Sequence, residues 1–138
     1  MDLGKIFSMF TDASESVVSP YAKEIDSIKK HPAFHLGMFH KIINRENDIH
    51  LQMVIQSLDV DEETKENIGE MSTYLTFTQA YNYLTLIDLD NTTHVNYLTI
   101  CENADFLEAA AKALEYFEST EEFEKCGFIK KVIDLTIQ

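Results

Sequence analysis

Residues 105–135 read DFLEAAAKALEYFESTEEFEKCGFIKKVIDL, and this stretch carries the clearest folding signal of the chain. Its apolar residues recur at helical spacing, so two helices are expected. Asp105 with Glu108, and Ser119 with Glu122, are spaced as N-terminal capping pairs that open the two helices. Helices joined by so short a turn should be antiparallel neighbours. The expected inner faces are Phe106, Ala110, Ala113, Leu114 and Phe117 in the first helix, and Phe123, Cys126, Ile129 and Ile133 in the second, flanked by Phe128 and Val132.

Upstream of this hairpin the periodicity is also helical. Asp90 to Thr93 reads as a turn or cap before a short helix that contains Val95 and Leu98. Residues 73–78 alternate enough for a strand, but the spacing of the apolar residues that follow favours a helix through Ile87. Before it, Asp59 and Glu62 form a capping pair for a polar helix that should end near Met71.

Four further helices or helical segments are expected nearer the N-terminus. Pro32 should end one helix and begin the next, which runs to about Asn44. The predicted inner positions are Leu3, Ile6, Phe7 and Phe10 in a first helix, Tyr21, Ile25 and Ile28 in a second that Ser19 and Pro20 open, Phe34, Met38, Phe39, Ile42 and Ile43 in a third, and Leu51, Val54, Ile55 and Leu58 in a fourth that Asn47 or Asp48 caps. The sequence therefore predicts an all-α fold, a compact multi-helix bundle that ends in an antiparallel hairpin, as a single domain over residues 1–138.

The hairpin at residues 112–135 resembles the UVR motif, a small helical hairpin of bacterial excision-repair and stress proteins. Leu114, the run Glu122-Phe123-Glu124-Lys125-Cys126 and the run Ile129-Lys130-Lys131-Val132-Ile133 carry the resemblance. It departs from the motif at Cys126 and Gly127, where small alanines are usual, and at Lys130 and Lys131, where Arg-Asp is usual. The resemblance implies a hairpin that contacts other proteins.

Charge is unevenly distributed along the 138 residues. Residues 1–58 hold 6 Lys/Arg and 7 Asp/Glu, a net charge of −1, whereas residues 59–138 hold 5 and 17, a net charge of −12. Such a surface repels nucleic-acid phosphates and anionic lipids and attracts a basic partner. The alternative is that the acidity only keeps the protein soluble. The start of the chain lacks a secretory pattern and no apolar run is long enough for a membrane span, so a cytoplasmic protein is expected.

Catalytic and cofactor motifs are not evident. His31 and His35 have the spacing of two ligands on one helix face, but Pro32 lies between them, and histidines on the surface or at caps are expected in place of a metal site. Cys101 and Cys126 lie in apolar stretches and are expected to be free, buried thiols. The four glycines are isolated, so no phosphate-binding loop is expected. We therefore expect no enzyme activity, no cofactor and no metal.

Two features are candidates for a partner surface. One is the carboxylate cluster around the predicted hairpin turn, and the other is a tyrosine stripe at seven-residue spacing, because tyrosine is favoured in binding hot spots. The candidate partner-binding residues are Glu115, Glu118, Glu121, Glu122, Glu124, Tyr74 and Tyr81. The alternative for both is a solvated face and an aromatic core.

The sequence thus favours a non-catalytic protein that binds a basic protein partner as an inhibitor or regulator. By analogy of composition, phage-encoded host-takeover or anti-defence factors, DNA mimics and toxin immunity proteins are of this kind. Two alternatives are an accessory subunit of a nucleic-acid-processing complex, held through the UVR-like hairpin, and a histidine-based metal-binding bundle. No direct contact with nucleic acid or membrane is expected.

Overall fold

The computed structural model describes residues 21–45 and 49–137. All regular structure in these residues is helical, which confirms the all-α prediction. The chain divides between His31 and Pro32 into two compact units, and the single domain over 1–138 stays a prediction. The helix expected over residues 3–10, Ser19 and Pro20, and the cap at Asn47 or Asp48 lie outside the described residues. The helices are α2 (Ala22–Lys30), α3 (Pro32–Asn44), α4 (Ile49–Ser57), α5 (Glu62–Leu84), α6 (Thr92–Ile100), α7 (Ala104–Ser119) and α8 (Phe123–Thr136).

The break at Pro32 is confirmed. His31 has an extended backbone, with ψ at 138°, and α3 begins at the proline. In the first unit, Tyr21, Ile25 and Ile28 are all exposed, and α2 has no buried residue. The prediction that they face inward was wrong, because helical spacing creates an apolar face but does not supply a surface to cover it.

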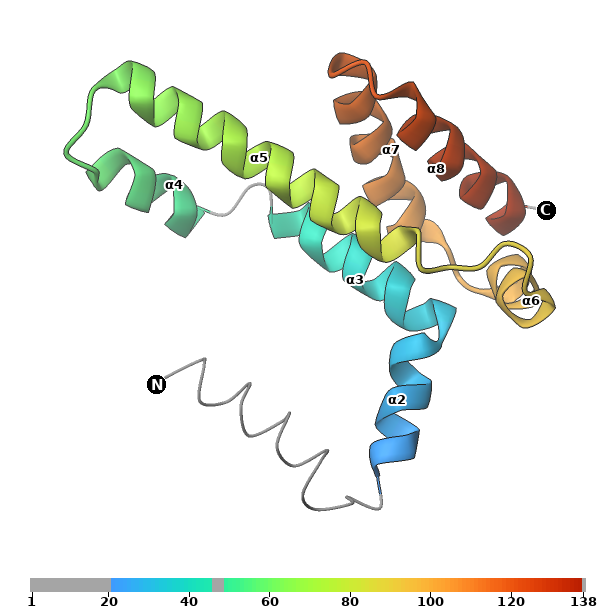
Figure 1. Ribbon diagram of the computed structural model, residues 1–138. Coiled ribbons are helices and arrows are strands. Elements are labelled where there is room, and N and C mark those ends of the chain that lie inside the picture. The colour runs from blue at the N-terminus through green and yellow to red at the C-terminus, as the bar shows by residue number, and fades with distance from the viewer. Residues whose placement is uncertain (1–20, 46–48, 138) are drawn as a thin grey trace. The chain divides into compact units, whose positions relative to one another are not determined.

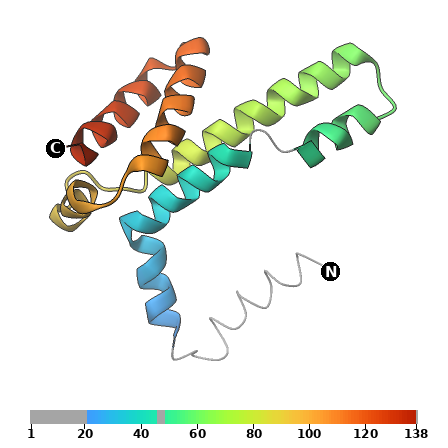
Figure 2. The same ribbon diagram turned by 180° about the vertical axis from the view of Figure 1, so that it is seen from behind.

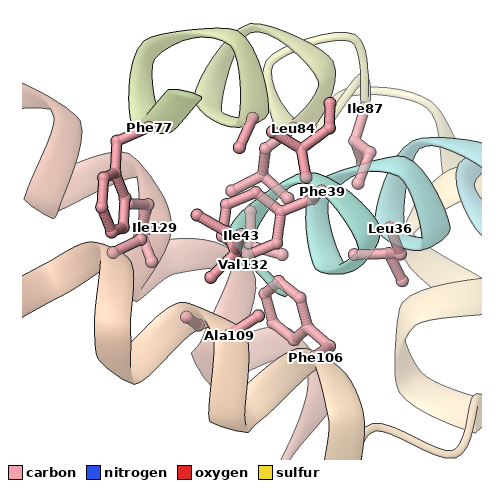
Figure 3. Close-up of a cluster of buried hydrophobic side chains, with 14 of the residues drawn as sticks. Leu36, Phe39, Ile43, Phe77, Leu84, Ile87, Phe106, Ala109, Ile129 and Val132 are labelled. Carbon is pink, nitrogen blue, oxygen red and sulfur yellow. The ribbon is translucent and has the colours of Figure 1, made fainter. Parts of the chain in front are cut away.

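In the second unit α3 is the central helix and packs against α5, α6 and α7 (Figures 1 and 2). Phe39, Ile42 and Ile43 are almost completely buried, as predicted. Phe39 lies against Phe106 of α7, with ring centroids 5.7 Å apart. Figure 3 shows this core, in which side chains of α3, α5, α7 and α8 meet. The buried residues come mainly from these four helices.

α5 is one 23-residue helix, where the sequence predicted two. Its N-cap is Asp61, whose carboxylate accepts a hydrogen bond from the Thr64 amide at 2.7 Å, so the prediction of Asp59 as cap was wrong by two residues. The choice of helix over strand for residues 73–78 was right. Phe77 and Leu84 are buried in the second half of the helix, whereas residues 62–76, all described, contain no buried side chain.

α4 contributes little to the core. Ile55 is buried, but Leu51, Val54 and Leu58, predicted to lie inside, are exposed by between 38% and 57%. The helix packs along the first part of α5, as both ribbon views show (Figures 1 and 2). A largely exposed helix without Asp, Glu, Lys or Arg is unusual.

α7 and α8 form the predicted antiparallel hairpin, and α8 also packs on α6. The capping pairs were wrong: neither Asn103 nor Glu122, the observed N-caps, bonds to its helix through the side chain. Asn103 instead donates to the Thr136 carbonyl at 2.6 Å, which ties the start of α7 to the end of α8. The turn contains Glu121 at φ 61°, a left-handed conformation that is costly for a residue with a side chain.

Phe106, Ala110, Ala113 and Phe117 of α7 are buried as predicted, and Ala109 joins them, whereas Leu114 is only half-buried. In α8, Cys126 and Ile129 are buried as predicted, but Val132, expected at the flank, is buried and Ile133 is only half-buried. Phe123, expected inside, is 64% exposed because it lies at the first position of α8, beyond the end of α7. The Asn91 cap of α6 is confirmed, since its side chain accepts from the Thr93 amide at 2.9 Å. In the described part of the chain, no helix is long and apolar enough to cross a membrane.

Candidate functional site

The acidic cluster lies around the α7–α8 turn, and lysines of α8 neutralise two of its members. Glu122 Oε1 lies 3.0 Å from Lys125 Nζ, and Glu118 Oε1 lies 3.9 Å from Lys130 Nζ. The remaining three carboxylates are exposed and form no ion pair with any residue that the structure describes. These unpaired carboxylates are Glu115, Glu121 and Glu124.

The tyrosine stripe of α5 lies beside this turn, so the two candidate surfaces meet. Lys125 Nζ lies 5.9 Å from the ring centroid of Tyr74, 5.4 Å from that of Tyr81 and 5.2 Å from that of Phe117. These distances are within the range of cation–π attraction. Lys125 therefore joins the acidic turn to the aromatic stripe.

The two tyrosines have different surroundings. Tyr74 is 43% exposed, whereas Tyr81 is half-buried against Phe117 and Phe128, with ring centroids 5.8 and 6.0 Å away. Burial raises the pKa of the Tyr81 hydroxyl. Tyr81 is thus mainly a packing residue in this structure, and Tyr74 is the tyrosine of the stripe that solvent reaches more.

Lys125 was missed by the sequence analysis. Its position in the run Glu-Lys-Cys looks like that of an ordinary surface lysine, and its aromatic contacts come from two other helices. The usable signal was the excess of carboxylates around it, since one lysine among four glutamates should find an ionic partner. Which aromatic rings lie beneath it depends on how α8 packs on α5 and α7, and that packing has no local signature.

The pKa of Glu122 is set by opposing effects. Partial burial acts to raise it, but hydrogen bonds with Lys125 and Thr120, together with the lysine charge, lower it below the ordinary value of a glutamate. The Thr120 hydroxyl donates to Glu122 Oε2 at 2.8 Å. Glu122 is therefore held ionised by its neighbours, and it anchors the turn.

The histidines do not converge. His35 is buried, contrary to the expectation of surface or capping histidines, because it lies on the inner side of α3. His94 does act at a loop: its Nδ1 accepts from the Asp88 amide at 3.0 Å. Within residues 21–45 and 49–137, the structure contains no group of three or more His, Cys, Asp or Glu side chains that could hold a metal ion.

Both cysteines are free thiols, as predicted. Cys126 is buried, whereas Cys101 is only half-buried, so the expectation of burial holds for one of them. Burial raises the pKa of both thiols, which makes them weaker nucleophiles at neutral pH.

A groove that the sequence analysis did not anticipate lies among α4, α5 and the end of α7. It has a volume of about 590 Å³, and Leu51, Ile55, Gly69 and Tyr116 are among its walls. A smaller hollow of about 300 Å³ shares Tyr116 and Ser119 with this groove, and Glu115 also lines it. The groove thus lies close to the acidic turn. The sequence feature that could have indicated this groove is Gly69, an isolated glycine in a helical stretch.

No protein-family model, curated protein or solved structure matches the chain.

Proposed function

We propose that this protein acts without catalysis, by binding a basic protein partner as an inhibitor or regulator. The observation that carries the proposal is the convergence of unpaired carboxylates and an exposed tyrosine at the α7–α8 turn. Glu115, Glu121 and Glu124 are exposed without lysine partners among the described residues. The Tyr74 ring lies 5.9 Å from Nζ of Lys125, the lysine that pairs with Glu122 of the same turn. Such a surface combines long-range electrostatic attraction for a basic partner with a tyrosine that can contact the partner directly.

The charge arrangement supports a partner rather than a purely solubilising role. Mutual repulsion among close carboxylates costs stability, and a basic partner relieves it. The two ion pairs to Lys125 and Lys130 relieve it only in part. Association with a basic partner should then be fast, and it should weaken as salt screens the charges beyond a distance of about 8 Å at physiological ionic strength.

The test is capture of the partner by the tagged full chain from a cell lysate at low salt, release at high salt, and identification by mass spectrometry. The identified partner is then titrated with a variant in which Glu115, Glu121 and Glu124 are all changed to Gln. We expect association to slow about tenfold or more, with the melting temperature nearly unchanged.

The matched control changes Asp90 to Asn, Glu102 to Gln and Asp134 to Asn. All three are exposed, and the net charge changes by the same amount as in the first variant. If both variants associate with the partner at the same rate, position does not matter and the turn is not the binding surface. If neither differs from the wild type, the acidity serves solubility.

A second candidate is an accessory subunit of a nucleic-acid-processing complex. The antiparallel packing of α7 and α8 favours it, because a UVR-type module is such a hairpin. This candidate predicts that the captured partner itself contacts DNA or RNA and that substitution of the exposed Phe123 on α8 weakens capture.

A further inference from the structure

The groove among α4, α5 and the end of α7 looks polar in its residue types, but its chemistry is largely apolar. The Thr73 hydroxyl donates to the Gly69 carbonyl at 3.0 Å, and the Thr76 hydroxyl donates to the Ser72 carbonyl at 2.9 Å. At the end of α7, the Ser119 hydroxyl donates to the Tyr116 carbonyl at 2.5 Å. These hydroxyl hydrogens are therefore committed to the helices' own backbones and are not offered to a polar ligand.

What remains exposed in the groove is suited to large apolar side chains. Leu51 is 39% exposed, and Ile55 and the Tyr116 ring add further apolar wall. Gly69 leaves part of the floor open, since a Cβ built there meets no atom within 4 Å. An apolar side chain that entered here would be covered on several sides, as anchor residues are at protein interfaces.

The surroundings of the groove are acidic along α5, whereas Arg45, which precedes α4, contributes a positive charge to the opposite wall. Residues 49–57 of α4 contain no Asp, Glu, Lys or Arg, whereas residues 59–76 contain six Asp/Glu and one Lys, a net charge of −5. That lysine, Lys65, is turned toward α4, where its Nζ donates to the Gln56 carbonyl at 2.9 Å. Glu70 lines the groove, and Glu66 precedes it by one turn on the same helix face.

These charges distinguish between possible occupants. A second copy of this chain would bring another acidic α5 against the first, and an anionic lipid surface would be repelled. A helix with apolar residues on one face and Lys or Arg at its edges is complementary to both properties of the site, and an amphipathic helix in a groove is a common mode of recognition.

We propose that this groove binds an amphipathic helix of the partner protein, with large apolar side chains between α4 and α5 and basic side chains at Glu66 and Glu70. The inference rests on the proposed function, since it names the part of the basic partner that docks. It also explains why α4 remains apolar while it is exposed: its partner surface is on another protein.

The test uses the full chain and a fluorescein-labelled synthetic peptide of about five helical turns, with Leu and Phe on one face and Lys on its flanks. A peptide of the same composition, scrambled to abolish the apolar face, is the ligand control. Fluorescence anisotropy should show binding of the amphipathic peptide that is about tenfold tighter than that of the scrambled peptide.

The decisive variant is Gly69→Phe, which fills the groove, and we expect it to weaken binding of the amphipathic peptide by about tenfold or more. Gly127→Phe is the matched control, because a Cβ there also meets nothing within 4 Å but lies on α8, outside the groove. If Gly69→Phe disturbs folding, Leu51→Asp tests the same wall by placing a charge in it.

Three results would overturn the proposal. The first is equal binding by the wild type and both groove variants. The second is equal binding of the amphipathic and scrambled peptides, in which case charge alone acts and the proposed function survives without the groove. The third is a wild-type dimer in sedimentation that Gly69→Phe converts to a monomer, which would identify a second copy as the occupant. Conversely, if the tagged chain captures no partner in a salt-dependent way but still binds the amphipathic peptide, the proposed function at the α7–α8 turn is refuted. The proposal that the groove binds a helix then survives.

Discussion

Lys125 has two kinds of partner at once, a carboxylate and three aromatic rings, and its side chain is only 23% exposed. Lys125→Met keeps most of the aliphatic stem but removes the ammonium charge that pairs with Glu122 and lies near the three rings. We expect the free energy of unfolding to fall by about 1–2 kcal/mol. Chemical denaturation measures it.

Lys131→Met is the control for this substitution, because Lys131 is exposed on the same helix and forms no ion pair with the described residues. It should change stability by less than about 0.5 kcal/mol. Equal effects of the two substitutions would mean that the aromatic contacts of Lys125 contribute nothing.

The lowered pKa of Glu122 predicts how the stability of the protein changes at acidic pH. Because its pKa is lower in the folded protein than in the unfolded chain, its contribution to stability is present above the ordinary glutamate value of about 4.5 and is lost as the pH falls through the lower folded value. Glu122→Gln should therefore lose less stability than the wild type between about pH 5 and the folded pKa. Thermal melts over a pH series would show the two stability curves converging in acid, and parallel curves would contradict the assignment.

At the scale of the element, the start of α5 depends on Asp61. Asp61→Ala removes the acceptor for the Thr64 amide, and we expect a drop of about 2–4 °C in the melting temperature. Asp59→Ala, two residues earlier, should have little effect. A larger loss at Asp59 would restore the cap that the sequence alone suggested.

Helix identity could be predicted from the sequence far better than helix ends. The spacing in α3, α7 and α8 identified most of the buried positions because each of these helices presents one continuous apolar stripe to the core. The cap predicted at Asp59 was wrong because Asp59 and Asp61 stand close together, and only the backbone path decides which carboxylate reaches a free amide. The caps predicted at Asp105 and Ser119 were wrong because α7 and α8 begin at Ala104 and Phe123 without a side-chain cap.

The residues of the candidate site were proposed from the sequence, but their arrangement was not. The glutamates and tyrosines could be found from composition and spacing, whereas their meeting at Lys125 depends on the packing of α5 against the hairpin. The exposure of α4 was missed for a related reason. Periodicity shows that Leu51, Val54 and Leu58 share a side of the helix, but it does not show how much of that side other helices cover.

At the scale of the second unit, burial is concentrated at one end of α5. Its second half packs in the core, while residues 62–76 and α4 contribute only Ile55 to the buried set. Local opening is easiest where few apolar contacts hold an element. We expect amides of α4 to exchange with deuterium at least about a hundredfold faster than those of α3 and α7. Equal protection would show that α4 is held by contacts beyond those described here.

The central position of α3 has a consequence for the newly made chain. α3 leaves the ribosome before every helix that covers it in the second unit, and the last residue of α7 lies 75 positions beyond Asn44. At a synthesis rate of roughly 5–20 residues per second, Phe39, Ile42 and Ile43 stay uncovered on the α7 side for roughly 4–15 s. During that interval the same side chains that later form the core are open to chaperones and to aggregation, so the yield of folded protein depends on translation speed more than its final stability suggests.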